Sequence, residues 1–320
     1  MKPHVLFWAT VFAFSFLRCG DAKDPGSGRF PEYKFVTSTP NAQDLWPCFS
    51  PDSQRLLFTR TMDGKTWELF TVSVDDGKPS PFPAQSPMFG TRANWSAAKD
   101  LIAYNGQPSK GRFNLVVMKG DGTGLRVLVT ATKSDQMSYP SWYPDGMSFA
   151  VVDFSGDEES AIKRIDIENG TVVTLTDPKT HWAGVPRVSP DGKNIVMCGQ
   201  VKQGQRYSQY QNQIWFLNSE GNLRPLDSKR GWAPFWSPDG QWIVFASDRG
   251  GDDGRRAIFV ASPDGKTVQQ LTPPELNAGH PTWSPDGKWI AFFAQFSEDK
   301  ESRGLAVVQA DEAVKLIRAQ

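Results

Sequence analysis

The chain has 320 residues, and its 35 Lys and Arg residues balance its 35 Asp and Glu residues, so the formal net charge is zero at neutral pH. Nucleic-acid binding depends on a basic patch or stripe, and the basic clusters here, such as Lys229-Arg230, are too short to form one. We therefore expect no nucleic acid among the partners. A chain of this length can bury a large core within a single domain.

The first 22 residues differ in kind from the rest of the chain. The apolar stretch from Val5 to Leu17 is too short to span the roughly 30 Å hydrocarbon core of a bilayer as a helix. Small residues follow it, with Gly20 and Ala22 at the two positions that a signal peptidase reads. We therefore expect residues 1–22 to be a signal peptide, residues 23–30 to be a flexible tether, and the protein to be exported.

Cys19 leaves the manner of export open. It follows the apolar stretch, where bacterial lipoproteins carry their lipidated cysteine, and so it resembles a lipoprotein attachment site. Arg18 stands where such sites place a small residue. Lipidation at Cys19 would anchor the protein at the outer membrane, whereas cleavage after Ala22 would release it into the periplasm. We expect no other attachment to a membrane.

One short phrase recurs through the rest of the chain. Its best copies are the segments from Trp236 to Gly240 and from Trp283 to Gly287, which both read Trp-Ser-Pro-Asp-Gly. The residues in its proline column are Pro51, Ala97, Pro144, Pro190, Pro238 and Pro285. A period this regular indicates a repeat architecture.

Each repeat unit can be read as four strands, most clearly in the fifth unit. There the strands are expected at residues 233–237, 241–248, 257–262 and 267–272. Tight turns join the first strand to the second and the third to the fourth, because proline presets φ, aspartate bonds locally and glycine accepts a positive φ. Six such units predict an all-β fold, a six-bladed β-propeller of four-stranded antiparallel blades over residues 31–320.

Two details of this prediction concern the ends of the chain and the weakest repeat. Tyr33–Thr37 and Ala313–Arg318 both align with a fourth strand, and we favour the N-terminal segment as the one that closes the ring. No segment after residue 22 carries a sustained helical pattern. In unit two, Ala97-Ala98-Lys99 replaces Pro-Asp-Gly, which places Lys99 where glycine would take a positive φ.

The repeated phrase and its flanks resemble the TolB-type propeller repeat, a WD-like family. Residues 281–292 follow its pattern Pro-x-Trp-Ser-Pro-Asp-Gly-Lys-x-Ile-Ala-Phe almost letter for letter. The resemblance implies a β-propeller, export to the periplasm or cell envelope, and a role in holding other proteins. We expect no counterpart here of the separate α/β domain that precedes the propeller in TolB.

The topology of such units separates two faces. The Pro-Asp-Gly turns emerge on one face, here called the turn face. The loops that precede the first strand and join the second to the third emerge on the other, here called the variable face, where binding residues are usually found. The candidate partner-binding residues lie near the start of the innermost strands on that face, and they are Asp44, Trp46, Arg92, Tyr139, His181, Trp182, Trp232 and His280. The tryptophans that recur with the phrase, Trp95, Trp142, Trp236 and Trp283, are expected in the core.

The sequence contains no constellation typical of an enzyme. A nucleophile elbow is absent, and the two histidines on the propeller are too few for a His-rich metal site. We therefore expect no catalytic residues, no metal and no cofactor, with Cys48 and Cys198 as buried free thiols. The first hypothesis is a monomeric scaffold that docks a protein partner of the cell envelope on the variable face. The alternative is a propeller enzyme or receptor that acts on a small carbohydrate-like ligand in the axial pocket.

Overall fold

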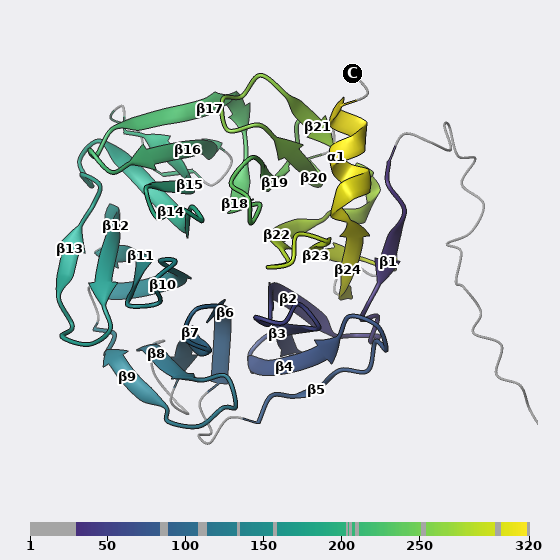
Figure 1. Ribbon diagram of the computed structural model, residues 1–320, viewed down its shortest axis with the longest axis horizontal. Helices are drawn as coiled ribbons and strands as arrows, with labels where there is room; N and C mark the ends of the chain where they lie inside the picture. Colours follow the sequence, from purple (N-terminus) through teal and green to yellow (C-terminus); the bar gives the residue numbers. More distant parts are fainter. Residues whose placement is uncertain are drawn as a thin grey trace, which may run out of the picture.

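The computed structural model describes residues 30–83, 89–107, 114–132, 135–155, 159–202, 204, 207–208, 211–250, 254–297 and 302–318. The predicted signal peptide, nearly all of the tether, and Cys19 lie outside these ranges. The β-sheets are arranged around a common centre, with β2, β6, β10, β14, β18 and β22 innermost (Figure 1). No helix in the described ranges is long and apolar enough to cross a membrane.

Four of the sheets are four-stranded, and each follows the order of the chain from the inside outward. Every strand pairs antiparallel with the next one. The inner strands of these sheets are β6 (Phe89–Ser96), β10 (Asp135–Trp142), β14 (His181–Val188) and β18 (Trp232–Trp236). The second strands are β7 (Leu101–Gln107), β11 (Ser148–Ser155), β15 (Asn194–Val201) and β19 (Ile243–Ser247). The third strands are β8 (Asn114–Lys119), β12 (Glu159–Asp166), β16 (Gln213–Asn218) and β20 (Ala257–Ala261), and the outer strands are β9 (Arg126–Val129), β13 (Val172–Thr174), β17 (Leu223–Arg230) and β21 (Val268–Gln270).

The prediction of six four-stranded blades is wrong. Only four sheets are four-stranded, and the strands from the two ends of the chain form a single eight-stranded sheet. A parallel pairing of Gln43 with Arg303 joins β2 to β24 and so merges the two groups. The strands of this sheet are β1 (Tyr33–Phe35), β2 (Gln43–Phe49), β3 (Arg55–Thr61), β4 (Glu68–Ser73), β5 (Ser80–Pro81), β22 (Gly279–Trp283), β23 (Trp289–Gln295) and β24 (Arg303–Gln309).

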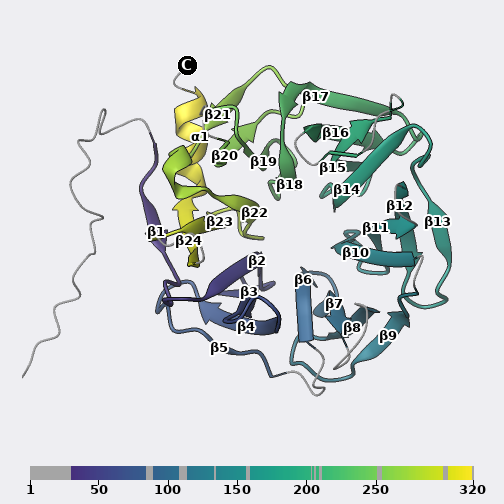
Figure 2. The same ribbon diagram turned by 180° about the vertical axis from the view of Figure 1, so that it is seen from behind.

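The N-terminal segment closes the ring, as we favoured. β1 pairs antiparallel with β24, with Lys34 opposite Val307. Because β1 occupies that edge, the C-terminal segment has no strand to pair with, and it forms the helix α1 (Ala310–Arg318) instead. The view from behind shows α1 beside β21 and β24 (Figure 2). The expectation of a chain without helices is therefore wrong at this end, and a 3-10 turn, η2 (Pro274–Leu276), precedes β22.

The repeated phrase forms the tight turns that were predicted. In unit five, the Ser237 hydroxyl donates to Asp239 Oδ1 at 2.5 Å and accepts from the Trp242 backbone N–H at 2.9 Å. Gly240 takes the positive φ, 69°. In unit two the prediction for Lys99 is wrong, because the next residue, Asp100, carries the positive φ of 49°.

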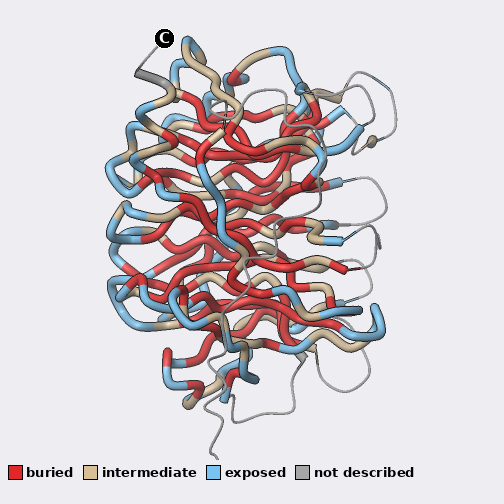
Figure 3. The backbone as a smooth tube through the Cα atoms, turned by 90° about the vertical axis from the view of Figure 1, so that its right-hand side faces the viewer, coloured by how far each residue is buried: buried red, intermediate tan, exposed pale blue. Residues whose placement is uncertain are grey.

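The recurring aromatic residues lie in the core and connect neighbouring units. Trp236 is 7% exposed, and its indole N–H donates to the carbonyl of Arg187 at 3.1 Å. Trp142 donates to the carbonyl of Asn94 in the preceding unit at 3.0 Å. In a view of the ring from the side, buried segments fill the interior between the two faces and exposed segments gather at the edges (Figure 3). Cys48 is a buried free thiol, and so is Cys198, as predicted.

Candidate functional site

Each innermost strand has a bulge at which its antiparallel register shifts. Examples are the shifts between Leu45 and Cys48 in β2 and between Thr91 and Asn94 in β6. Within each shift, one residue other than glycine takes a left-handed conformation with φ between 46° and 56°. A bulge of this kind re-aims a side chain. The six re-aimed residues are Trp46, Arg92, Tyr139, Val185, Ala233 and His280.

The bulge belongs to the fold, but the side chains that it carries differ from unit to unit. A left-handed conformation costs an L-residue roughly 1–2 kcal/mol, and it is least favourable for a β-branched residue such as Val185. The surrounding strands hold all six positions in this conformation. Because the backbone repeats while the side chains vary, these positions are where the repeat acquires a specific surface.

Four of the six side chains meet across the centre, and we call Trp46, Arg92, Tyr139 and His280 the axial cluster. The guanidinium carbon of Arg92 lies 4.5 Å from the ring centre of Trp46 and 4.7 Å from that of Tyr139. The Tyr139 ring stacks on the His280 imidazole with 5.9 Å between centroids and 4° between planes. Contacts of a cation with aromatic faces are strongest where water is excluded.

His280 is neutral in this cluster, and its proton position follows from its partner. Burial, together with the positive charges of Arg187, Arg92 and Arg256, holds the pKa of His280 well below its ordinary value of 6.5. The Trp46 indole can only donate, and its Nε1 lies 3.2 Å from Nε2 of His280. Nε2 therefore accepts, and Nδ1 carries the proton.

A pocket of about 300 Å³ opens beside the axial cluster. Tyr139 and His280 line one side of it. Val185 and Ala233 also line the pocket, and their side chains are smaller than those of the axial cluster at the equivalent bulge positions. Trp182 and Trp232 belong to the lining too. Phe154 and Tyr207 belong to the lining as well, and they are 41% and 48% exposed. The pocket lining thus contains six Phe, Tyr and Trp rings among its eighteen residues, and two of these rings are open to solvent at its rim.

Positive charge lies in and near this pocket. Arg256 belongs to the lining, with its guanidinium carbon 4.1 Å from the centre of the Trp232 ring, and Arg187 lies in β14, two residues after Val185. Burial lowers the pKa of Arg187 to about 10, so it remains charged at neutral pH. Within the described ranges, neither Arg92 nor Arg187 forms an ion pair, and the Nε of each has no hydrogen-bond partner. The lining carries one carboxylate, the exposed Glu159.

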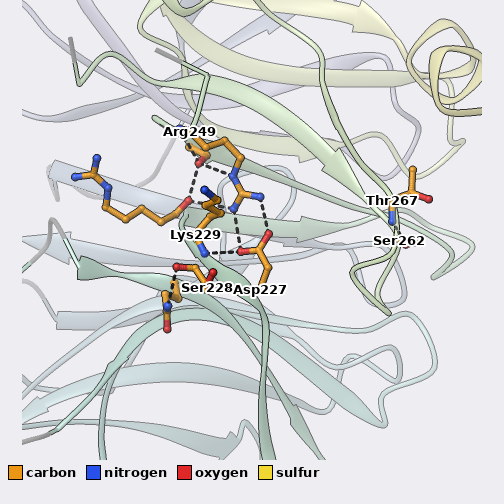
Figure 4. Close-up of polar contacts among 9 residues, drawn as sticks. Asp227, Ser228, Lys229, Arg249, Ser262 and Thr267 are labelled. Atoms are coloured by element: carbon orange, nitrogen blue, oxygen red, sulfur yellow. Dashed lines mark hydrogen bonds and ion pairs between the residues drawn. The ribbon is translucent and has the colours of Figure 1, made fainter. Parts of the chain in front are cut away.

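An ion pair fixes the segment that leads into Trp232. Arg249 Nη1 donates to Asp227 Oδ2 at 2.7 Å, and its Nε donates to the hydroxyl of Ser247 at 2.9 Å. Figure 4 shows the two charged side chains pointing toward one another, well apart from the turn of Ser262 and Thr267. This contact joins β17 to the segment that follows β19.

The structure brings together six of the eight predicted residues. The axial cluster comprises Trp46, Arg92, Tyr139 and His280, and the adjoining pocket adds Trp182 and Trp232. Asp44 lies elsewhere, fully buried, and accepts two hydrogen bonds from Arg60 at 2.7 Å. His181 packs edge-on against Trp215 at 4.9 Å. The set of Asp44, Arg92, His181 and His280 therefore does not converge on one pocket.

Sequence reasoning missed the residues that make the pocket hollow. Val185 and Ala233 carry no chemistry of their own, and their signal was positional, since they occupy the same column as Trp46 and Arg92. It also missed Arg187 and the rim residues Phe154 and Tyr207.

A larger hollow of about 480 Å³ is lined by residues of the repeated turns, so it belongs to the turn face. In the part of the chain that the structure describes, no group of three or more metal-ligating side chains occurs.

The sheets around a common centre, with an axial site at their inner strands, define the class of protein as an all-β propeller. Residues 109–315 match the PD40 family, the TolB beta propeller domain. The chain therefore belongs to this family.

The curated relatives cover parts of the chain. An uncharacterized protein of Agrobacterium fabrum is 29% identical over 193 residues, which are 59% of this chain and 60% of that protein. A Tol-Pal system protein TolB of Francisella tularensis is 33% identical over 158 residues, which are 49% of this chain and 34% of that protein. The chain thus spans less than two thirds of the length of these two relatives.

Solved structures agree with the fold. One from Agrobacterium tumefaciens, described as a "putative TolB", superimposes with a TM-score of 0.61 and 23% identity, covering 86% of this chain and 93% of that one. An oligogalacturonate lyase in complex with manganese gives a TM-score of 0.56 and 16% identity, covering 90% of this chain and 96% of that one. At these identities the likeness concerns the fold alone.

Proposed function

We propose that this protein is an exported, non-catalytic scaffold that docks a protein partner of the cell envelope on the variable face. The observation that carries the proposal is the axial cluster beside an aromatic-lined pocket with two exposed rings at its rim. Aromatic and arginine side chains dominate the binding energy of protein interfaces. A partner segment that enters the pocket would bury Phe154 and Tyr207, which are the aromatic residues of the lining most exposed to solvent.

The cellular part of the proposal rests on the predicted signal peptide and on the family. Export would place the propeller in the periplasm, or at the outer membrane if Cys19 is lipidated. We propose a monomer that holds its partner through the propeller. Because the chain spans 34% of the Francisella protein, the partner is defined here as an envelope protein and not as a component of a Tol-Pal system.

An affinity capture from envelope extract tests this function. The test variant is Phe154→Ala with Tyr207→Ala, which removes both exposed rings, and circular dichroism checks that it is folded. The control is Lys266→Ala with Lys288→Ala on the turn face, where both lysine side chains are at least 75% exposed. We expect a partner that the wild type and the control retain and that the test variant loses. Recovery of the same proteins by all three would contradict docking on the variable face.

A second candidate is a receptor or enzyme for a small carbohydrate-like ligand, favoured by the aromatic walls of the axial pocket. Flat aromatic rings suit the apolar faces of sugars as well as those of peptides. The same capture experiment distinguishes the two candidates. A scaffold should retain a protein partner that is lost when the rim residues are changed, whereas a receptor or enzyme for a small ligand should retain no such protein.

A further inference from the structure

We propose that the axial pocket binds a carboxylate attached to an apolar or aromatic body, with the carboxylate at Nδ1 of His280 and the body between Trp182 and Trp232. This inference deepens the docking proposal and rests on it for the face that is used. It specifies the chemistry that the pocket recognises, which the family match does not.

The first argument is a hydrogen-bond donor without a partner. Trp46 occupies Nε2 of His280 and thereby assigns the proton to Nδ1. Nδ1 makes no hydrogen bond with any described residue, although His280 lines the pocket. A donor on a residue that lines the pocket is therefore available to an acceptor group of a ligand.

The second argument is charge. Arg92, Arg187 and Arg256 all act electrostatically on His280. Arg92 is held between the faces of Trp46 and Tyr139, so that only its in-plane N–H groups remain for hydrogen bonds. One of them donates to Thr91 Oγ1 at 3.1 Å. An acceptor that enters this field is favoured if it is negatively charged, and a carboxylate fits an imidazole N–H beside guanidinium groups.

The third argument is the aromatic part of the lining. Trp182 and Trp232 both line the pocket and are 5% and 8% exposed, so they offer apolar ring surface to the body of a ligand. A pocket of about 300 Å³ lies at the lower end of the range for small-molecule sites. It therefore suits one ring or one apolar side chain with its carboxylate, and not a long ligand.

Two sources could supply this group, a free small acid or the C-terminal end of a protein chain. Asn212 offers a way to tell them apart. Its amide lines the pocket, Nδ2 donates to the hydroxyl of Tyr207 at 3.0 Å, and Oδ1 has no partner within the described residues. A chain end brings a backbone N–H that can donate to this amide, whereas a simple acid does not.

Calorimetric titration with two small probes tests the charge requirement. The probes are 3-phenylpropanoate and its neutral isostere 3-phenylpropanamide, titrated into the full exported chain. We expect the carboxylate to bind at least tenfold more tightly, since a hydrogen bond to a charged group is stronger than one to a neutral group. Equal affinity of the two probes, or no binding of any carboxylate probe, would overturn the proposal.

Variants locate the binding. His280→Phe keeps the ring that stacks on Tyr139 but removes the donor, and we expect it to weaken carboxylate binding at least tenfold with little effect on the amide. Ala233→Leu fills the pocket, leaves the axial cluster intact and should abolish binding. Lys266→Met removes one positive charge on the turn face and should change nothing. If His280→Phe and Ala233→Leu both bind the carboxylate like the wild type, the site is wrong.

A second pair of probes distinguishes the sources. N-acetylphenylalanine mimics a chain end, and N-acetylphenylalaninamide is its neutral control. Tighter binding of N-acetylphenylalanine than of 3-phenylpropanoate, lost in Asn212→Ala, supports a chain end, whereas the reverse order supports a free acid. The titrations can fail while the envelope capture succeeds, and the capture can fail while the titrations succeed. The carboxylate proposal and the docking proposal can therefore be refuted independently.

Discussion

Asp44 provides a sharp test, because it was predicted as a binding residue and the structure places it in a buried ion pair. Its side chain is fully buried, and Arg60 donates to both of its oxygens at 2.7 Å. Thr37 donates to Oδ2 at 2.6 Å, and the Leu305 backbone N–H in turn donates to the Thr37 hydroxyl. The carboxylate thus links β2, β3 and the ring closure at β24.

Asp44→Ala would leave the Arg60 guanidinium buried at 9% exposure without its counter-ion. Breaking a buried pair by removing one partner typically costs 3–5 kcal/mol. In a chain of this size each kcal/mol lowers Tm by roughly 2–4 °C, so a drop of about 6–20 °C is expected. Thermal unfolding followed by circular dichroism measures it.

The exposed pair of Asp311 and Lys315 serves as the control. Its oxygen and nitrogen lie 3.0 Å apart, but both side chains are more than 60% exposed, and surface pairs contribute little. Asp311→Ala should therefore leave Tm unchanged. If Asp44→Ala melts within about 1 °C of the wild type, the buried pair does not hold the ring closed, and the structural reading of Asp44 is wrong.

Three further predictions concern turns, thiols and pH. Gly287→Ala should lower the free energy of unfolding by about 1 kcal/mol, because φ is positive at Gly287 while the space around it is open. Gly265→Ala should lower it more, because the new Cβ would lie 2.6 Å from a carbonyl oxygen of the neighbouring unit. Equal losses for the two variants in urea unfolding would contradict this prediction. Burial raises the pKa of Cys48 to about 12 and that of Cys198 to about 11. Neither thiol should therefore react with a disulfide reagent at pH 8 until the protein unfolds. Labelling of the folded protein as fast as that of the denatured protein would contradict the burial of these thiols. His280 stays neutral in the folded protein but takes up a proton below pH 6.5 in the unfolded chain, so the free energy of unfolding decreases as the pH falls through 6.5. Between pH 7.5 and 5.5, the Tm of His280→Phe should therefore fall less than that of the wild type. Parallel plots of Tm against pH would show that the folded protein does not hold His280 neutral.

The sequence was sufficient for the repeat and its turns, because the phrase that forms them is local. Ser237 and Asp239 bond within two residues of each other, so their spacing alone indicates the geometry. The merging of two units into one sheet rests on a single parallel residue pairing, Gln43 with Arg303. Such a contact between the ends of the chain leaves no local pattern.

The site was only partly predictable for a similar reason. The inner-strand column identified Trp46 and Arg92, but Ala233, which occupies the same column and lines the pocket, has neither a ring nor a charge to mark it as a binding residue. Asp44 was assigned to binding although Arg60 lies directly opposite it in the register of β2 and β3. Opposite charges facing each other across a hairpin are a recognisable stabilising pair, and that signal was available.

The most direct test of the axial site is the indole N–H spectrum of the tryptophans during titration with 3-phenylpropanoate. Trp46, Trp182 and Trp232 belong to the axial cluster and the pocket, whereas Trp95 and Trp236 are buried in the blade cores. We predict that the first three signals shift with one common affinity while the core signals stay in place. Shifts confined to the core tryptophans would contradict the central claim that this protein binds at its axis.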